Sequence, residues 1–385
     1  MLYYLIQYLE RNFQPPGFQV VQFITVRASL AAITALFISM IVGRRIIKWL
    51  ADKQLGEEVR QGESAGGVDH SHKRGTPTMG GVIILFAVLG STFLWGAIAE
   101  VHVWLAMLAT AWMGVFGFAD DYIKVVKRDK SGLPARIKVI GQVTLGLIVG
   151  AVIYLHPQFQ DYRTLTYLPF AAGGQLDYNF LAGLIDGVDL GWLIYIPVVV
   201  FIVTALSNAV NLTDGLDGLA AGVTGIVAVG LTVLCYVAGN AIFSDFLSEP
   251  QLAGAGELTV FALALAASCF GFLWFNGYPA SVFMGDTGSL ALGAAVGTTT
   301  LLIRKEILLP LLCAVFFMES LSVIIQTGWF KYTRKKTGTG RRVFRMAPIH
   351  HHWEAAGMHE NKIVVRFWLV TAVTVVAALL ILRLR

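Results

Sequence analysis

Residues 111–126 read AWMGVFGFADDYIKVV, an apolar run that ends on two adjacent carboxylates, Asp120 and Asp121. Adjacent carboxylates repel each other, and a segment apolar enough to enter a bilayer is a costly place for them. Pairing with Lys124, three and four residues further on, is the simplest explanation. That pairing needs only one acid, and both lie near a helix C-terminus, which disfavours negative charge. The pattern therefore favours a divalent cation or a proton-transfer role.

The chain around this run has the composition of a membrane protein. Of its 385 residues, 56% are hydrophobic and 14% are charged, whereas a soluble protein carries about 25% charged residues. The three cysteines lie in apolar runs without close spacing, so they indicate packed hydrophobes and not a disulfide framework or a zinc site. The N-terminus lacks a basic start and a small-residue cleavage site, so no removable signal peptide is expected.

Ten runs are candidate membrane spans. They lie near 20–43, 80–99, 102–119, 137–155, 192–212, 219–238, 257–275, 288–303, 307–330 and 363–382. The eighth is short and rich in glycine, and only the turn IRKE separates it from the ninth. The sequence thus predicts an all-α integral membrane protein, a single polytopic domain over residues 1–385, with about ten transmembrane helices and an active-site cleft on its cytoplasmic face.

The basic residues predict the sidedness of these spans. Most of them fall in three segments, 43–75, 124–138 and 331–345, which the positive-inside tendency places in the cytoplasm. The even span count then places both termini outside. With this topology every polar motif falls on the cytoplasmic face, and we expect no comparable polar cluster on the outer side. A short hairpin is expected there within residues 156–180.

The motif NAVNLTDGLDGLAAG, residues 208–222, places Asn211, Asp214 and Asp217 three residues apart. This spacing predicts that all three line one face of a helix, and Gly215 allows close approach of a ligand or another backbone. A capped helix break, with Asp214 as the capping residue, is the alternative. It leaves the other two polar residues unexplained.

Two further motifs have the residue types that bind phosphate and a flat base. FNGYPASVFMGDTGSLALG places Asp286 just before a span, with Asn276 upstream and Phe283 as a stacking surface. An ordinary helix start is the alternative for Asp286. SHKRGTPTMGG offers Lys73 and Thr78 to phosphate oxygens, although the spacing of a P-loop is absent.

The run RMAPIHHHWE contains His350, His351 and His352. Three successive histidines on a regular helix cannot all face one tetrahedral zinc ion, so we interpret them as donors to a diphosphate or a sugar. A histidine-rich surface loop is the alternative. Gln326, near the cytoplasmic end of the ninth span, is a buried amide that is expected to form hydrogen bonds.

Together these motifs place at least five acids on one membrane face, with lysines and histidines nearby. Bare acids at this density would raise each other's pKa values and cost stability. Mg²⁺ relieves that repulsion and is usually held by one or two carboxylates plus substrate phosphates. Phosphoryl transfer suits such a site, because its catalysis consists mostly of positioning and charge neutralisation.

Five segments in this order, KRGTPTMGG, GFADDYIK, NAVNLTDGLDGLA, FNGYPASVFMGDTGS and MAPIHHHWE, closely resemble the phospho-N-acetylmuramoyl-pentapeptide-transferase (MraY) family. That family belongs to the polyprenyl-phosphate N-acetylhexosamine-1-phosphate transferases, and the resemblance runs from about residue 20 to the C-terminus. It implies a ten-span enzyme of the bacterial inner membrane that acts in peptidoglycan synthesis. Such an enzyme uses Mg²⁺ to transfer phospho-MurNAc-pentapeptide from UDP-MurNAc-pentapeptide to undecaprenyl phosphate, giving lipid I and UMP.

The resemblance also implies roles for individual residues. Asp286 is expected to bind Mg²⁺ together with Asp121, and either Asp120 or Asp121 to deprotonate or orient the lipid phosphate. Lys124 is expected to contact phosphate. The expected nucleoside and phosphate pocket consists of Lys73, Asn211, Asp214, Gly215, Leu216, Asp217, Asn276 and Phe283. Further positions expected to contact the donor are Thr78, Gln326, His350, His351 and His352. The expected partners are the two substrates, membrane lipid and a second copy of the chain in a homodimer. Nucleic acid is not an expected partner.

Two other functions compete with this interpretation. A sibling enzyme would transfer GlcNAc-1-phosphate from UDP-GlcNAc to the same lipid, but the histidine motif argues against it. A membrane transporter would keep its acids at mid-membrane depth on facing helices, whereas these acids lie at span ends on one side. Direct attack and a covalent aspartyl-phosphate intermediate both remain open.

Overall fold

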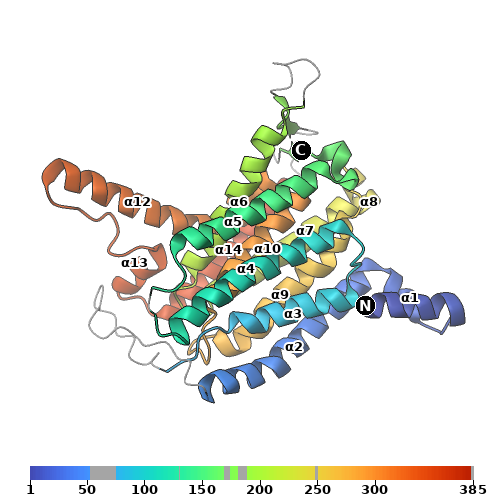
Figure 1. Cartoon of the computed structure of the whole chain (residues 1–385), viewed down its shortest axis with the longest axis horizontal. Helices are drawn as coiled ribbons and strands as arrows, with labels where there is room; N and C mark the ends of the chain where they lie inside the picture. The colour runs from blue at the N-terminus through green and yellow to red at the C-terminus, as the bar shows by residue number, and fades with distance from the viewer. Residues whose placement is uncertain (53–74, 130, 169–173, 181–188, 248–249, 383–385) are drawn as a thin grey trace.

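The computed structural model describes residues 1–52, 75–129, 131–168, 174–180, 189–247 and 250–382, and these form a helical bundle (Figure 1). The long helices run alongside one another, so their ends gather at two opposite ends of the bundle. Within the described residues the only sheet has two short strands. The prediction of an all-α membrane protein is therefore confirmed.

The described elements up to residue 177 are α1 (Leu2–Phe13), η1 (Phe18–Gln22), α2 (Ile24–Asp52), α3 (Gly81–Trp95), α4 (Val101–Val125), α5 (Ala135–Leu155), η3 (Pro157–Tyr162), β1 (Leu165–Tyr167) and β2 (Gln175–Asp177). Those that follow are α6 (Trp192–Thr213), α7 (Leu219–Gly239), α8 (Ala241–Phe246), η5 (Ala255–Glu257), α9 (Leu258–Asn276), α10 (Gly285–Leu302), η6 (Glu306–Leu308), α11 (Leu309–Leu312), α12 (Ala314–Thr337), α13 (Ile349–Ala355) and α14 (Glu360–Ile381). Every predicted span overlaps at least one of these helices.

Seven helices of the described chain are long and apolar enough to cross a membrane, namely α2, α4, α5, α6, α7, α9 with η5, and α14. An eighth is added if η6–α11 and α12 are counted as one bent span. α3 is apolar but shorter. All ten predicted spans thus correspond to helices, while length and composition alone qualify seven or eight of them.

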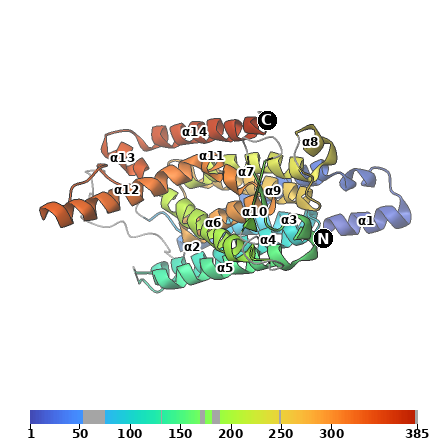
Figure 2. The same ribbon diagram turned by 90° about the horizontal axis from the view of Figure 1, so that it is seen from above.

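The remaining predicted span, α10, lies at the centre of the bundle. Every residue from Thr287 to Leu302 is buried, and the helix packs against α3, α4, α6 and α7. Figure 2 shows α14 and α5 on opposite sides of the bundle with α10 between them. Glycine, alanine, serine and threonine dominate α10, which lets neighbouring helices approach closely but lowers its hydropathy.

The ninth predicted span, 307–330, is not one straight helix. η6–α11 and α12 are bent by 81° relative to each other, and Cys313 at the break has non-helical backbone angles (φ −108°, ψ 28°). α12 then leaves the bundle and projects outward (Figures 1 and 2). Hydropathy could not reveal this change of direction, because the residues on both sides of the break are apolar.

The predicted hairpin is present at the end of the bundle where α10 ends, called here the hairpin end. β1 and β2 pair antiparallel, with Leu165 opposite Asp177. The hairpin rests on the turn after α10, where the carbonyl oxygen of Arg304 accepts a hydrogen bond from the Tyr167 N–H (3.4 Å). This contact ties the hairpin to the central helix.

Beneath the hairpin lies a polar cluster that the sequence did not predict. Arg304 is fully buried, and its guanidinium donates to the hydroxyl of Tyr195. Glu306 is 5% exposed and accepts a hydrogen bond from the Tyr178 hydroxyl (3.4 Å). The expectation of no comparable polar cluster on this side is therefore wrong. Its charged members lie in the turn IRKE, but their burial depends on Tyr178 and Tyr195 from distant segments, which the sequence could not show.

Candidate active site

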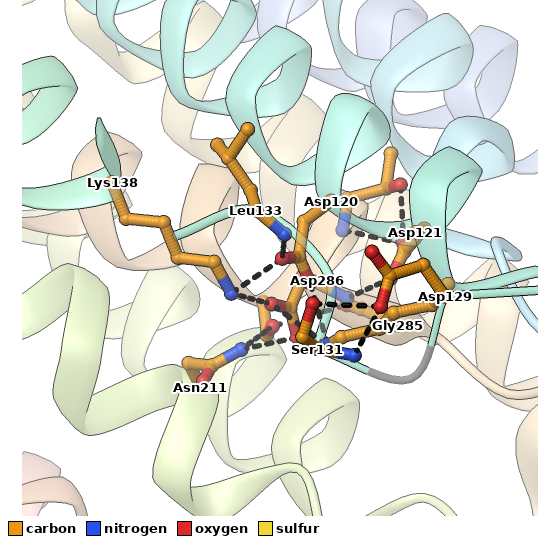
Figure 3. A network of polar contacts seen from close by, with 12 residues as sticks. Asp120, Asp121, Asp129, Ser131, Leu133, Lys138, Asn211, Gly285 and Asp286 are labelled. Carbon is orange, nitrogen blue, oxygen red and sulfur yellow. Dashed lines mark hydrogen bonds and ion pairs between the residues drawn. The ribbon is translucent and has the colours of Figure 1, made fainter. Parts of the chain in front are cut away.

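The predicted motifs converge at the opposite end of the bundle, where α4 ends and α10 begins, called here the acidic end (Figure 3). Asp120, Asp121 and Asp286 each place one carboxylate oxygen within 4.8 Å of the others. The first two lie in the last turns of α4, and Asp286 lies in the first turn of α10. The acids thus lie at helix ends, whereas a transporter would keep its acids at mid-membrane depth on facing helices.

Asp121 acts as a cap for the N-terminus of α10, supplied by a different helix. Its Oδ1 accepts from the backbone N–H of Asp286 (3.0 Å) and its Oδ2 from that of Thr287 (2.9 Å). The Thr287 hydroxyl donates a third hydrogen bond to Oδ2 (2.6 Å). These contacts satisfy N–H groups that a helix start leaves unpaired, and the negative charge suits the helix dipole. Asp121 therefore fixes the position of Asp286.

Two glycines make this approach of α4 and α10 possible. A Cβ built on Gly117 would lie 2.1 Å from the carbonyl oxygen of Asp286. A Cβ on Gly285 would lie 2.5 Å from Asp121 Oδ2, and Gly285 also has a φ of +73°, which disfavours other residues. The glycines of the GFADD and MGDTG segments thus bring the two acidic motifs into contact.

Two lysines, Lys124 and Lys138, contact these carboxylates, and Figure 3 shows Lys138 beside Asp120 and Asp286. Lys124 Nζ is 2.5 Å from Asp120 Oδ2 and 3.4 Å from Asp286 Oδ2. Lys138 Nζ is 2.9 Å from Asp120 Oδ1 and 2.6 Å from Asp286 Oδ2. Lys124 was predicted, but Lys138, in the first turns of α5, was not. Lys138 lies at the end of a basic loop, and the sequence indicated only on which side of the membrane that loop lies, not that this lysine contacts the acids.

Asn211, near the C-terminus of α6, completes the contacts of Asp286. Its side-chain N–H₂ donates to Asp286 Oδ1 (2.9 Å) and to the Ser289 hydroxyl (2.9 Å). Both oxygens of Asp286 therefore have defined neighbours, an amide on one and ammonium groups on the other. The side chain of Asp286 is still 15% exposed, so it can be reached from outside the bundle.

The prediction that Asn211, Asp214 and Asp217 line one helical face is wrong. α6 ends at Thr213, and Asp214 follows it with non-helical angles (φ −80°, ψ 58°). Gly218 has a φ of +77°, which ends any continuation of the helix. Asn211 contacts Asp286, whereas Asp217 turns toward a neighbouring loop, where its Oδ2 accepts from the Ala280 N–H (2.9 Å).

Residues 214–218, called here the DGLDG loop, are held from two further sides. The N–H of Asp217 donates to Glu360 Oε1 at the start of α14 (2.7 Å). The N–H of Gly218 donates to Asn276 Oδ1 (3.1 Å), while Asn276 Nδ2 donates to Val282 O (2.9 Å). Asn276 is thus buried as a bridge between two loops. Within the loop, Leu216 is buried and Gly215 is exposed.

The segment before α3 is joined to the loop before α10. The N–H of Phe283 donates to Pro77 O, and the N–H of Gly80 donates to Phe283 O, both at 2.8 Å. Thr78 lies within this pairing and is 8% exposed. Thr78 and Phe283, each predicted to contact the donor, therefore lie on two segments that are paired with each other. Lys73 lies outside the described residues.

The three histidines of α13 have three different surroundings. His350 is fully buried, with Nδ1 3.1 Å from Glu319 Oε2 on α12. His351 Nδ1 lies 2.9 Å from Glu354 Oε2, and His352 Nδ1 accepts from the Arg345 N–H (3.1 Å). They do not converge on one point, as expected for side chains that do not share a zinc ion. Burial lowers the pKa of His350 below its ordinary value, which favours the neutral ring.

Gln326 is only partly buried, so the prediction of a buried amide is wrong, and it holds the chain that precedes the histidines. Its Oε1 accepts from the N–H groups of Val343 and Phe344, both at 2.9 Å. Its Nε2 donates to Phe344 O (3.1 Å). The expected hydrogen bonds of this amide are therefore present, and they fasten the segment after α12 to α12 itself.

The acidic end has the residues that a divalent cation needs. Three carboxylates face two ammonium groups, so these five groups carry one more negative than positive charge. Carboxylate oxygens are ligands that Mg²⁺ prefers, and the partial exposure of Asp286 leaves room for ligands from a substrate. Ammonium groups beside the carboxylates can contact phosphate oxygens. The site is thus suited to charge neutralisation around a diphosphate.

Comparison with known proteins agrees with this chemistry. The chain matches a family model described as "Glycosyl transferase family 4" over residues 103–304, slightly more than half of its length. It also matches "Phospho-N-acetylmuramoyl-pentapeptide-transferase signature 1" over residues 73–85. That signature contains Lys73 and Thr78.

Curated relatives match over their whole length. The protein of Salinibacter ruber (strain DSM 13855 / M31) is 64% identical over 385 residues, and that of Chloroherpeton thalassium (strain ATCC 35110 / GB-78) is 49% identical. That of Chlorobium limicola (strain DSM 245 / NBRC 103803 / 6330) is 48% identical. Each match covers all of both chains, and each relative is named phospho-N-acetylmuramoyl-pentapeptide-transferase.

Proposed function

Since the chain belongs to the family of the phospho-N-acetylmuramoyl-pentapeptide-transferases, we propose that it transfers phospho-MurNAc-pentapeptide from UDP-MurNAc-pentapeptide to undecaprenyl phosphate. The products are lipid I and UMP. The family acts on a nucleotide-sugar and a lipid carrier, and the chain is a multi-pass membrane enzyme. The observation that carries the proposal is the grouping of three carboxylates and two lysines at one end of the bundle.

In the proposed reaction an oxygen of the lipid phosphate attacks the sugar-linked phosphorus of the donor. The bond between the two donor phosphates breaks, and UMP leaves with the electron pair of that bond. Asp286 is the best placed metal ligand, because Asn211 orients one of its oxygens and its side chain is partly exposed. A bound Mg²⁺ would supply positive charge to the diphosphate oxygens.

The two adjacent acids have different proposed roles. Both oxygens of Asp121 accept hydrogen bonds from the start of α10, which suits a residue that positions Asp286. Asp120 lies between Lys124 and Lys138, where its carboxylate can take the proton of the lipid phosphate or orient that group. The two lysines are then available to the phosphate oxygens. This division of roles suits direct attack and needs no covalent intermediate.

The DGLDG loop is the proposed nucleoside site. It presents the exposed Gly215 beside His350, and Glu360 and Asn276 hold its backbone. We place the acidic end at the cytoplasmic face of the bacterial inner membrane, with both termini in the periplasm, because Lys124 and Lys138 of the basic segment 124–138 lie at this end. A homodimer remains a prediction.

The experiment that tests this function is UMP release by the detergent-purified protein. The assay contains UDP-MurNAc-pentapeptide and undecaprenyl phosphate, with either Mg²⁺ or EDTA, and a control omits the lipid. We expect UMP only when both the lipid and Mg²⁺ are present. UMP formed only from UDP-GlcNAc would move the chain to the sibling activity, and no UMP from either donor would overturn the proposal.

A further inference from the structure

A buried contact between an imidazole and a carboxylate lies behind the DGLDG loop, outside the group of acids and lysines. His350 of α13 and Glu319 of α12 both have 0% exposure, and Nδ1 lies 3.1 Å from Glu319 Oε2. Neither Glu319 oxygen has a further hydrogen-bond partner among the described residues. A buried carboxylate is costly without a polar neighbour, so this imidazole is the group that makes the position of Glu319 tolerable.

The other ring nitrogen points toward the proposed nucleoside site. A Cβ built on Gly215 would lie 2.2 Å from His350 Nε2, so the ring packs directly against the backbone of the DGLDG loop. Nε2 is buried and has no hydrogen-bond partner within the described part of the chain. Gly215 itself is exposed. A ligand seated on Gly215 would therefore lie beside a ring nitrogen that has no partner from the protein.

The contacts of the two neighbouring histidines differ from those of His350. His351 pairs with Glu354 of its own helix, and His352 accepts from a nearby backbone N–H. His350 instead has a carboxylate neighbour on α12, Glu319. Its carboxylate neighbour at Nδ1 fixes the ring orientation and favours the tautomer with the proton on Nδ1. Nε2 is then left as an acceptor, as in metal and catalytic sites where a carboxylate orients the far side of a histidine.

We propose that Glu319 is a positioning residue for donor binding, which holds His350 so that Nε2 accepts a hydrogen bond from the nucleotide-sugar at Gly215. This inference rests on the proposed function. It assigns no chemical step to Glu319, whose effect on the reaction passes entirely through the imidazole. The acceptor lipid is bound elsewhere in this scheme, so only the donor should respond to Glu319.

The test compares Glu319→Leu with Glu319→Gln in the UMP-release assay. Leucine removes the acceptor for Nδ1–H, whereas the glutamine oxygen can still accept it. We expect Glu319→Leu to raise the KM for the nucleotide-sugar about tenfold, the effect of one lost hydrogen bond. The kcat and the KM for the lipid should change little, and Glu319→Gln should recover most of the loss.

A double-mutant cycle separates positioning from a purely structural role. His350→Ala should raise the donor KM at least as much, and adding Glu319→Leu to it should have no further effect. Glu306→Leu, a buried glutamate at the hairpin end, is the matched control and should lower the melting temperature without changing the donor KM. Additive losses in the cycle, or a wild-type KM in a folded Glu319→Leu protein, would overturn the inference. An inactive wild-type protein would instead refute the proposed function.

Discussion

The two ends of α10 both gather buried polar side chains, but they differ in the sign of their excess charge and in exposure. At the acidic end, three carboxylates face two lysines, and Asp286 is 15% exposed. At the hairpin end, the guanidinium of Arg304 and the carboxylate of Glu306 lie among tyrosines, with 0% and 5% exposure. The first end has an excess of acids that an outside ligand can reach. The second, which also holds Lys305 at 5% exposure, is closed.

The ends of α10 also differ in what its backbone groups contact. At its start, Asp121 from α4 accepts from two N–H groups and a hydroxyl, which places an acid beside the other carboxylates. After its end, the carbonyl oxygen of Arg304 accepts from the Thr166 hydroxyl (3.3 Å) and from the hairpin backbone. Burial of polar groups alone therefore does not identify a site. Uncompensated charge at a reachable position does.

The strongest test of this comparison removes the charge of Asp286. We expect Asp286→Asn to lower kcat by about a thousandfold, because electrostatic groups aimed at the reacting charge contribute effects of this size. The melting temperature should change little, since the asparagine oxygen can still accept from either Asn211 or a lysine. UMP release measures the activity, with Asp245→Asn on the exposed helix α8 as the control. Near-normal turnover of Asp286→Asn would remove the acidic end from the reaction.

The next test separates the two adjacent acids. Asp120→Asn should lower kcat about a hundredfold with little change in stability, because it removes the carboxylate that lies between two lysines. Asp121→Asn should lower both activity and stability, the latter by about 1–2 kcal/mol, as expected for loss of a helix cap. UMP release and thermal unfolding in detergent measure the two effects. Equal and mild losses of activity in both variants would mean that the pair forms only salt bridges.

A smaller effect is expected at Lys138. Lys138→Met keeps the length of the side chain but removes the ammonium that contacts Asp120 and Asp286. We expect kcat to fall by about ten- to a hundredfold, less than for Asp286, because Lys124 still supplies one positive charge. Lys331→Met, on the projecting helix α12, is the control for loss of a basic residue at this end. Equal activities of the two variants would show that the contact with Lys138 is not used.

The sequence predicted the acids of this site because each one begins or ends an apolar run. At such positions a carboxylate is costly, so Asp120, Asp121 and Asp286 stand out without any structural information. The convergence of the motifs on one end followed from counting spans between them. These inferences depend on local composition and on whether an even or odd number of spans separates two motifs. Both can be read directly from a sequence.

Other features depend on contacts between distant segments and could not be predicted. Lys138 is one basic residue among many in a loop whose charge the membrane topology already explains. Asp121 became a helix cap only because Gly117 allows α4 to approach α10. The polar cluster around Arg304 joins a turn to residues of α6 and of the hairpin region. The three-residue spacing of Asn211, Asp214 and Asp217 suggested one continuous helical face. The helix ends before Asp214, and the positive φ of Gly218 prevents its continuation.

The smallest expected effect on activity is at the hairpin end. Tyr195→Phe removes the hydroxyl that accepts from the buried Arg304 guanidinium. A buried donor left without its partner costs about 1–3 kcal/mol, so thermal unfolding should occur at a lower temperature. Activity at a temperature where the protein is folded should equal that of the wild type, since no charge at the acidic end changes. Loss of activity in the fully folded variant would show that the closed end of α10 also takes part in function, and the contrast between its two ends would fail.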